Sequence, residues 1–531
     1  MTTRAARAEP IASTQSRFAG WLPYAVLIAA LLFVLIVRIR LLSMPLERDE
    51  GEYAYAGQLL LEGVPPYREA FNMKFPGVYF AYALAMAIFG QTPTGIHLGY
   101  LVWNLATVPA MFYLGRRLFG GFAGSIAAAV YAVLSVSPGV LGFQAHATHF
   151  VVLAVLCAAL LLLRESSRER LAPTLSAGIL LGVATLMKQH GMFFILFAAG
   201  WIVYERRLVL RRLAAVLLGT AIPLLLTGIG LAASGVLDRF WFWTFDYARQ
   251  YVGVMSLSAG WQNFTITLPT VIGPYFLVWI IALAGLISIW WKRENRRAAV
   301  FVTLLLACSV LAICPGLYFR PHYFVLTLPA IALLAAAGIA SMSSFAGLPL
   351  AVAIFAATLI FPILQQSDLY FRLTNHQILR RLYSISPFPE APTIADYIRN
   401  HTAPNARIAI LASEPEIHFY SHRRGASGYI YMYGMMEPQP YALRMQKEMI
   451  ESIEAVRPEF VVFSPLSSTW DIRDNSSRYV FDWWSHYSDQ HYRKVGVAEV
   501  LDPERTVYVW DHLEGYQPKG DPVLIVYRRI D

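Results

Sequence analysis

The residues best suited to chemistry lie just after the first long apolar run of the chain. Arg48, Asp49, Glu50 and Glu52 place four charged side chains within five residues. Charges at the edge of a membrane are costly unless they are solvated or used. A carboxylate there could accept a proton from an attacking hydroxyl group. Alternatively, the acidic residues only cap a helix at 53–61, which we predict to be amphipathic and to lie on the membrane surface.

Lys74 belongs to a second segment, where it precedes Pro76 and Gly77 and has Phe71 and Phe75 nearby. A proline–glycine turn is rigid, and a lysine among aromatic rings can hold its charge at a membrane interface. The ammonium group could there bind the phosphate of a lipid. It could equally be an anchor that only reaches lipid headgroups, and spacing alone does not separate the two interpretations.

Arg320 and His322 lie in an aromatic segment, 318–324, between two apolar runs. Arginine can hold a phosphate through two parallel hydrogen bonds, and the histidine could donate beside it. The alternative is an aromatic belt with one anchoring arginine. Further candidates for the lining of a substrate cavity are Tyr67, Arg68, Lys188 and Tyr247. For Lys188 the alternative is an ordinary short turn, and for Tyr247 an interfacial aromatic belt.

His146 and His149 have the spacing of a metal-binding pair, but the sequence shows no evident third ligand. We therefore expect no metal and no other cofactor, although a divalent metal is compatible with the pair. The sequence has no P-loop, no convincing dinucleotide fingerprint and no nucleophile elbow. The missing nucleotide motifs argue against an ATP-driven pump.

Long apolar runs must position these residues. Hydrophobic residues make up 57% of the 531-residue chain and charged residues 15%, against about 25% charged residues in a soluble domain. We predict eleven membrane-spanning helices. They lie near 20–43, 96–115, 121–141, 148–163, 171–187, 190–204, 213–233, 268–291, 298–315, 323–341 and 346–364.

Basic residues are concentrated in alternate loops and indicate the orientation of the chain. Sixteen lysines and arginines fall in the N-terminal arm 1–19 and in the loops near 116, 166, 209 and 294. The positive-inside rule makes these segments cytoplasmic. An odd number of spans then places the C-terminal region outside. The first outer loop, 44–95, is long and lies on the same side, so we expect an extracytoplasmic active face.

The net charge of +9 does not indicate a nucleic-acid partner. Residues 1–364 hold 25 Lys/Arg and 13 Asp/Glu, a net +12, whereas residues 365–531 hold 18 and 21, a net −3. The positive excess thus lies between apolar runs, where it is a topology signal. All three cysteines lie in or beside apolar runs, and no disulfide framework is expected.

Residues 365–531 have the pattern of a small α/β domain, outside the transmembrane domain 20–364. Strands and helices alternate here, as expected for such a fold. We predict helices at 393–402 and 441–456, and strands at 407–412, 460–463 and 523–527.

The segment from Arg48 to Gly90 resembles the first outer loop of bacterial GT-C glycosyltransferases. It has an acidic pair after the first span, followed by Tyr-Ala-Tyr-Ala, Leu-Leu-Glu-Gly, Pro-Pro-Tyr and Lys-Phe-Pro-Gly. It is most similar to the protein-mannosyltransferase and aminoarabinose-transferase superfamily, known as family 39 or dolichyl-phosphate-mannose-protein mannosyltransferase-like. The likeness covers most of residues 20–364, and the Arg-Pro-His-Tyr turn and the outer α/β domain also fit.

This resemblance implies an enzyme of the bacterial inner membrane. It would transfer a sugar from a polyprenyl-phosphate donor to a glycan, lipid or protein acceptor, by a direct displacement that inverts the anomeric centre. Asp49 and Glu50 match the family's acidic pair, with Asp49 as the catalytic base or as a carboxylate that orients the acceptor, and Lys74 matches the ligand of the donor phosphate. Arg320 is a second phosphate ligand by the same likeness. A transporter or flippase of lipid-linked saccharides is the alternative.

Overall fold

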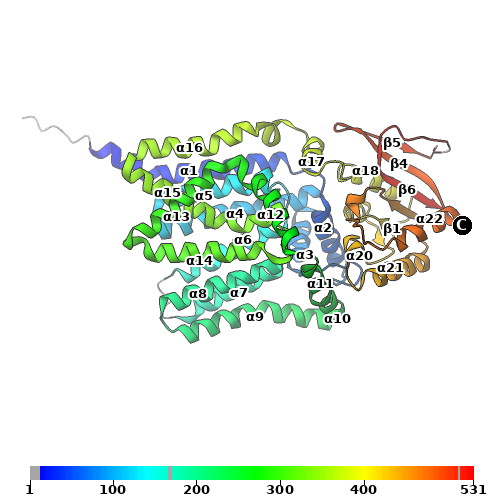
Figure 1. The fold of residues 1–531 in the computed structure, drawn as a ribbon, viewed down its shortest axis with the longest axis horizontal. Coiled ribbons are helices and arrows are strands. Elements are labelled where there is room, and N and C mark those ends of the chain that lie inside the picture. The colour runs from blue at the N-terminus through cyan, green and yellow to red at the C-terminus, as the bar shows by residue number, and fades with distance from the viewer. Residues whose placement is uncertain (1–11, 165–169, 512, 514) are drawn as a thin grey trace, which may run out of the picture.

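The structure is a computed structural model that describes residues 12–164, 170–511, 513 and 515–531. Figure 1 shows an elongated molecule with a bundle of long helices at one end and a smaller domain of helices and strands at the other. Residues 1–11 of the predicted arm 1–19, and Arg168 of a predicted inner loop, lie outside the described residues.

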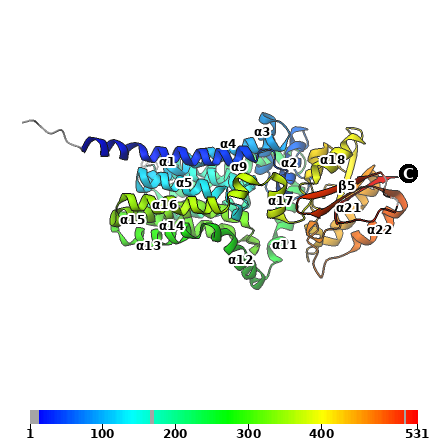
Figure 2. The same cartoon turned by 90° about the horizontal axis from the view of Figure 1, so that it is seen from above.

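Apolar helices that run in similar directions form the bundle (Figures 1 and 2). Each predicted span coincides with helical segments: α1 (Ala12–Arg40), α4 (Pro93–Phe119), α5 (Gly121–Ser135), α6 (Ala147–Leu162), α7 (Leu171–Met187), α8 (Phe193–Glu205), α9 (Val209–Ala233), α12 (Leu257–Ile272), α13 (Phe276–Trp291), α14 (Arg296–Ile313), α15 (Leu328–Ala346) and α16 (Leu348–Gln365). Within the described residues, seven helices are long and apolar enough to cross a membrane. The chain is therefore an integral membrane protein, and the number of eleven spans stays a prediction.

Small residues let the bundle helices α7 and α9 approach closely. A Cβ atom on Gly178 would lie 2.3 Å from the backbone oxygen of Val216, and one on Gly219 would lie 2.3 Å from that of Leu175. Close contacts through small residues are typical of helix pairs in membranes. On the opposite face, α9 exposes apolar side chains such as Leu225, as expected where a helix meets lipid.

Short elements connect the long helices. Figure 1 shows α2, α3, α10 and α11 at the end of the bundle that faces the smaller domain. The connecting elements are α2 (Arg48–Leu61), α3 (Gly77–Phe89), η1 (Pro138–Val140), η3 (Gln189–Met192), α10 (Leu237–Trp241), η4 (Phe242–Tyr247), α11 (Ala248–Gly253), η5 (Gly273–Tyr275), η6 (Arg293–Asn295), η7 (Pro315–Leu317), η8 (Pro321–Thr327) and η9 (Asp368–Arg372).

The prediction that the helix after Asp49 lies on the membrane surface is wrong. Helix α2 is buried along its length, from Glu50 to Leu59. It packs against α19 of the smaller domain so closely that a Cβ atom on Gly51 would lie 2.6 Å from the Cβ atom of Glu416. The apolar face seen in the sequence therefore meets protein rather than lipid, because the C-terminal domain covers the outer loop.

The C-terminal domain has the predicted α/β character. The five predicted elements match α18, α21, β1, β3 and β6, whereas β2, β4, β5, α17, α19, α20 and α22 were not predicted. The bounds are α17 (Asn375–Tyr383), α18 (Ala391–Asn400), β1 (Arg407–Leu411), α19 (Glu416–Ser421), β2 (Arg424–Gly425), α20 (Tyr433–Met436), α21 (Ala442–Val456), β3 (Phe460–Phe463), η10 (Ser467–Thr469), α22 (Tyr479–His491), β4 (Tyr492–Asp502), β5 (Arg505–Trp510) and β6 (Asp521–Arg529). The sheet order is β2-β1-β3-β6-β4-β5, with β1 parallel to both of its neighbours and β6 antiparallel to β3 and β4.

Direct contacts fix this domain on the first outer loop. The backbone N–H of Phe71 donates to the carbonyl oxygen of Gly428 at 2.8 Å. The Arg48 guanidinium lies 2.8 Å from Glu414 Oε1, which is fully buried. The ring of Tyr55 stacks on His418 with the centroids 4.8 Å apart. The residues after the first span are thus enclosed between the bundle and the C-terminal domain.

Candidate active site

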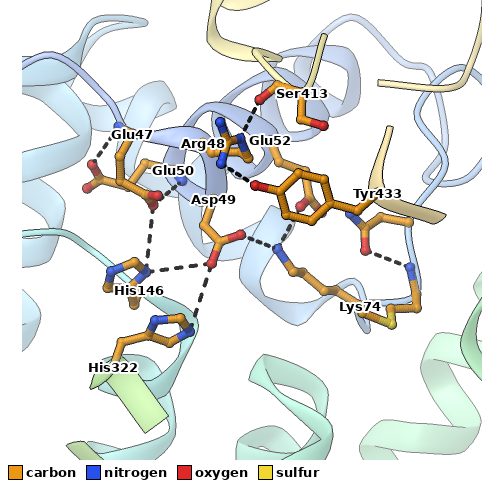
Figure 3. A network of polar contacts seen from close by, with 12 residues as sticks. Glu47, Arg48, Asp49, Glu50, Glu52, Lys74, His146, His322, Ser413 and Tyr433 are labelled. Carbon is orange, nitrogen blue, oxygen red and sulfur yellow. Dashed lines mark hydrogen bonds and ion pairs between the residues drawn. The ribbon is translucent and has the colours of Figure 1, made fainter. Parts of the chain in front are cut away.

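Asp49 lies at the centre of a network of polar contacts at the start of α2 (Figure 3). Lys74 Nζ lies 2.8 Å from Asp49 Oδ1 and 2.6 Å from Glu52 Oε2. Glu52 follows Asp49 by three residues, so the two carboxylates share a face of the helix. The Tyr79 hydroxyl donates a hydrogen bond to Glu52 Oε1 at 2.8 Å and so helps to hold Glu52 beside Lys74. Two segments that the sequence predicts on one side of the membrane thus meet directly.

Opposite charges keep Asp49 and Lys74 ionised. Burial alone would raise the pKa of Asp49, but the positive charges of Lys74 and Lys188 bring that pKa well below its usual range. Burial would lower the pKa of Lys74, but Asp49 and Glu52 raise it well above the ordinary value. The pair is therefore a carboxylate and an ammonium ion at neutral pH.

Two histidines lie on the other side of Asp49. Oδ2 of Asp49 is 3.8 Å from His146 Nδ1 and 3.9 Å from His322 Nε2, and the two imidazole rings stack at 4.2 Å. Burial lowers the pKa of His146 to about 4, so this ring is neutral. Among the described residues, neither nitrogen of His146 has a hydrogen-bond partner.

Asp49, His146 and His322 form a donor set in which the ligand atoms lie within 4.8 Å of one another. A carboxylate and two neutral imidazoles are ligands that suit a divalent ion such as Zn²⁺. The sequence showed no third ligand for a pair of His146 and His149. In the structure Asp49 and His322, rather than His149, lie beside His146. The His149 ring packs against Tyr100, with the ring centroids 5.1 Å apart.

Glu50, predicted to be catalytic beside Asp49, is not among the residues that line the cavity. Its side chain is fully buried, accepts a hydrogen bond from the Ala145 N–H at 2.7 Å and lies 3.1 Å from His97 Nε2. Successive residues of a helix point in different directions, so Asp49 faces the cavity while Glu50 faces the bundle. Glu50 also completes a capping box with Glu47 at the start of α2.

A cavity of about 480 Å³ opens beside Asp49 and Lys74. Its lining brings together many of the predicted residues: Asp49, Lys74, Lys188, Tyr247, Arg320 and His322. Lys188 Nζ lies 4.2 Å from the centroid of the Tyr323 ring, and burial lowers the pKa of this lysine to about 7. Arg320 is exposed to the cavity and forms no ion pair with any residue that the structure describes.

Tyr67 and Arg68 do not line this cavity. Tyr67 is buried against Phe240, and its hydroxyl donates to the carbonyl oxygen of Lys74 at 2.7 Å. Arg68 points the other way and lines a separate cavity of about 720 Å³, where it donates to the carbonyl oxygen of Ser234. Tyr67 adopts a positive φ of 64°, and the chain turns at this point. The structure therefore does not bring these two residues together with Lys188 and Tyr247 in the lining of one cavity.

The C-terminal domain supplies part of the lining, which the sequence analysis missed. Tyr429, Tyr431, Tyr433 and Glu437 all border the cavity. No spacing signal could reveal them, because they follow Asp49 by more than 370 residues. Glu52, in contrast, could have been found, since it lies one helical turn after Asp49 in the same acidic segment.

Comparisons with known proteins agree with this arrangement. A family model described as dolichyl-phosphate-mannose-protein mannosyltransferase matches residues 73–229. ArnT from Cupriavidus metallidurans, solved bound to undecaprenyl phosphate, shares 14% identity at a TM-score of 0.55, over 94% of this chain and 99% of that chain. The Archaeoglobus fulgidus oligosaccharyltransferase, solved tethered with an acceptor peptide, shares 14% identity at a TM-score of 0.54, over 94% of this chain and 75% of that chain.

A second structure of the archaeal enzyme, AglB in complex with an inhibitory peptide and a dolichol-phosphate, shares 13% identity at a TM-score of 0.54, over 94% of this chain and 75% of that chain. No curated protein matches the chain by sequence. The chain therefore has the fold of the GT-C glycosyltransferases, and its residues 73–229 match the dolichyl-phosphate-mannose-protein mannosyltransferase family model, which confirms the predicted resemblance.

Proposed function

We propose that this protein transfers a sugar from a polyprenyl-phosphate donor to an acceptor on the extracytoplasmic face of the membrane. The observation that carries the proposal is the contact between Asp49 and Lys74 in a cavity at one end of an apolar bundle. A lipid-linked donor keeps its chain in the bilayer and presents its phosphate near the interface. The cavity offers both a base for an acceptor and cations for such a phosphate.

Cations around the cavity suit the donor phosphate. Lys74 uses two of its three N–H donors on Asp49 and Glu52, so one donor is left for a ligand. Arg320 lines the same cavity and can hold phosphate oxygens through two parallel hydrogen bonds. The leaving phosphate gains negative charge as its bond to the sugar breaks, so positioned cations stabilise the transition state more than the ground state.

Asp49 is the proposed base. The acceptor hydroxyl attacks the anomeric carbon, a new oxygen–carbon bond forms, and the bond from that carbon to the phosphate oxygen breaks. The hydroxyl proton passes to Asp49, and the polyprenyl phosphate leaves with the electron pair. A single displacement of this kind inverts the anomeric centre. When Lys74 also binds the donor phosphate, the negative phosphate offsets part of its charge. Lys74 then lowers the pKa of Asp49 less, and the carboxylate becomes a better base.

The relatives support the class of the donor. ArnT was solved with undecaprenyl phosphate and AglB with a dolichol-phosphate. Both ligands are polyprenyl phosphates, which we propose as the leaving group here. The acceptor is a glycan, lipid or protein, and the reaction needs no cofactor, because Lys74 and Arg320 supply the positive charge. The proposed extracytoplasmic orientation rests on the basic loops at 206–212 and 292–297, and the proposed location in a bacterial inner membrane rests on the family resemblance.

Membrane vesicles that contain a labelled polyprenyl-phosphate sugar test this function. The proposal predicts that the label is transferred from the lipid to an acceptor in vesicles with the wild-type protein. Vesicles with the Asp49→Asn variant should show little transfer at equal protein amounts. Movement of the intact donor across the bilayer, without transfer, would instead identify a flippase.

A further inference from the structure

Glu437 is a buried carboxylate that the proposed reaction does not use. It follows α20 in the C-terminal domain, is only 2% exposed and borders the cavity. The Tyr247 hydroxyl, which belongs to the bundle half of the chain, donates to Glu437 Oε2 at 2.8 Å. A Cβ atom on Gly434 would lie 2.7 Å from that hydroxyl oxygen, so α20 sits directly against Tyr247. The two halves of the chain thus hold this carboxylate in place together.

The charged and titratable groups that face Glu437 come from several elements. They are Tyr247 of η4, Arg320 before η8, and Asp471 and Arg473 of the C-terminal domain. Burial raises the pKa of Glu437 to about 7, while the Tyr247 hydrogen bond and Arg473 oppose the rise. A carboxylate kept in a buried position, without an ion pair among the described residues, is suited to accept hydrogen bonds from a ligand.

Aromatic rings, among them Tyr251, Tyr431 and Tyr433, line the cavity. Tyr251 stacks on Tyr318 with the centroids 4.6 Å apart, and Tyr431 meets Tyr433 edge-on at 4.9 Å. Rings with polar hydroxyl groups can pack on a sugar ring and also bind its oxygen atoms. A pocket that combines apolar faces with a few fixed polar groups is the usual form of a small-molecule site.

Asp49 and Glu437, two of the carboxylates that line the cavity, have different charged neighbours. Lys74 and Lys188 are the cations that act on Asp49. The charges that act on Glu437 are instead those of Arg473, Asp471 and Arg320. Glu437 therefore lies on the side of the cavity that holds Arg320, one of the two cations proposed to bind the donor phosphate. A carboxylate would repel that phosphate, so its partner must be a neutral or positive group attached to it.

We propose that Glu437, held by Tyr247, binds hydroxyl or amino groups on the sugar of the lipid-linked donor and so helps to select that sugar. The C-terminal domain then contributes to substrate recognition as well as covering the site. This inference rests on the proposed transfer reaction. It concerns recognition of the sugar, whereas Lys74 and Arg320 recognise the phosphate, which every polyprenyl phosphate carries.

Binding measurements on the purified full-length protein separate the two kinds of recognition. The ligands are a polyprenyl-phosphate sugar and the same polyprenyl phosphate without the sugar. Glu437→Gln should weaken binding of the sugar-bearing lipid by about tenfold, as expected when a charged hydrogen-bond partner is lost. It should not weaken binding of the plain lipid phosphate, because the substitution only removes a negative charge that repels it. Glu451→Gln, at an exposed position on α21, is the matched control and should change neither affinity.

The outcomes distinguish the inference from the function on which it rests. Equal affinity of the wild type and Glu437→Gln for the sugar-bearing lipid, or an equal loss for both lipids, would overturn the role of Glu437. A change confined to the KM of the acceptor would also overturn it. Failure of the wild type to bind either lipid would overturn the proposed function instead. Thermal unfolding at the wild-type temperature shows that the variant is folded, since glutamine can still accept the Tyr247 hydrogen bond.

The pH dependence of donor binding gives a second readout. The donor KM of the wild type should fall as the pH rises through about 7, because Glu437 then loses its proton and becomes a stronger acceptor. Glu437→Gln should lack this fall, since glutamine does not titrate, whereas Lys188 titrates near pH 7 in both proteins and contributes the same background. The same pH dependence in both proteins would contradict the assignment.

Discussion

Lys74 joins the two acidic residues on one face of α2, with its ammonium nitrogen 2.8 Å from Asp49 Oδ1 and 2.6 Å from Glu52 Oε2. This contact gives the lysine two tasks in the proposed reaction. It orients the carboxylate that receives the acceptor proton, and it offers its third N–H to the donor phosphate. Binding of the donor and activation of the acceptor are thereby linked through one side chain.

Asp49→Asn should remove most turnover while the protein stays folded. Asparagine keeps the size of the side chain but cannot take up the acceptor proton, and loss of a general base lowers rates by about 10²–10⁴. The measurement is the initial rate of sugar transfer at equal amounts of folded protein. Asp238→Asn, at an exposed position of α10, is the control and should keep the wild-type rate. Near-normal transfer by Asp49→Asn would reduce Asp49 to a structural residue.

Glu50→Gln should act on stability rather than on chemistry. Its carboxylate is buried and bonded to the Ala145 N–H and to His97, so the change weakens contacts within the bundle. We expect a loss of about 1–3 kcal/mol in unfolding free energy, as for a buried charged hydrogen-bonding group. Thermal unfolding in detergent measures the change. A variant with normal stability and lost turnover would show instead that Glu50 takes part in catalysis.

Lys74→Ala and Arg320→Lys should both impair the use of the donor. Lys74→Ala removes a charge-assisted contact worth about 1.5–3 kcal/mol, and the loss should appear in kcat as well as in the donor KM. Arg320→Lys should be poorly tolerated if the arginine binds two phosphate oxygens. Donor-concentration kinetics with saturating acceptor provide the test, with Lys447→Ala on α21 as the exposed control. If only the acceptor dependence changes, the two cations do not bind the donor phosphate.

Chelation tests the expectation that no metal is needed. The donor set of Asp49, His146 and His322 can hold a divalent ion, but Lys74 already supplies a positive charge beside Asp49. We expect the transfer rate to persist in EDTA and to stay unchanged on addition of Zn²⁺. A rate that falls with EDTA and recovers with Zn²⁺ would place an ion on these three residues. His322→Ala should then remove the recovery.

The sequence predicted the parts of the site that depend on local patterns. Asp49 and Lys74 were found because charged side chains beside apolar runs are costly unless they are solvated or used, and Arg320 because it lies between two spans on the same side. Glu50 could not be separated from Asp49, because a sequence does not show which side chains of α2 point into the bundle and which point into the cavity. Glu437 gave no signal, since its relation to Tyr247 exists only after the chain folds.

The membrane orientation is testable apart from the chemistry. Reporter fusions should place residues 44–95 and 365–531 outside and the basic loops at 206–212 and 292–297 inside. Alkaline phosphatase and green fluorescent protein report the two sides by activity and by fluorescence. A cytoplasmic C-terminal domain would contradict both the number of predicted spans and the proposed side of the reaction.

The most direct test of the central claim follows two labels on one donor. Proteoliposomes receive a polyprenyl-phosphate sugar with ³²P in the phosphate and ¹⁴C in the sugar, together with an envelope extract as the source of acceptor. The account predicts that ¹⁴C passes to the acceptor while ³²P stays on the polyprenyl phosphate, and that Asp49→Asn abolishes the separation of the labels. Transfer of both labels together, or movement of the intact donor across the bilayer with the labels still joined, would contradict it.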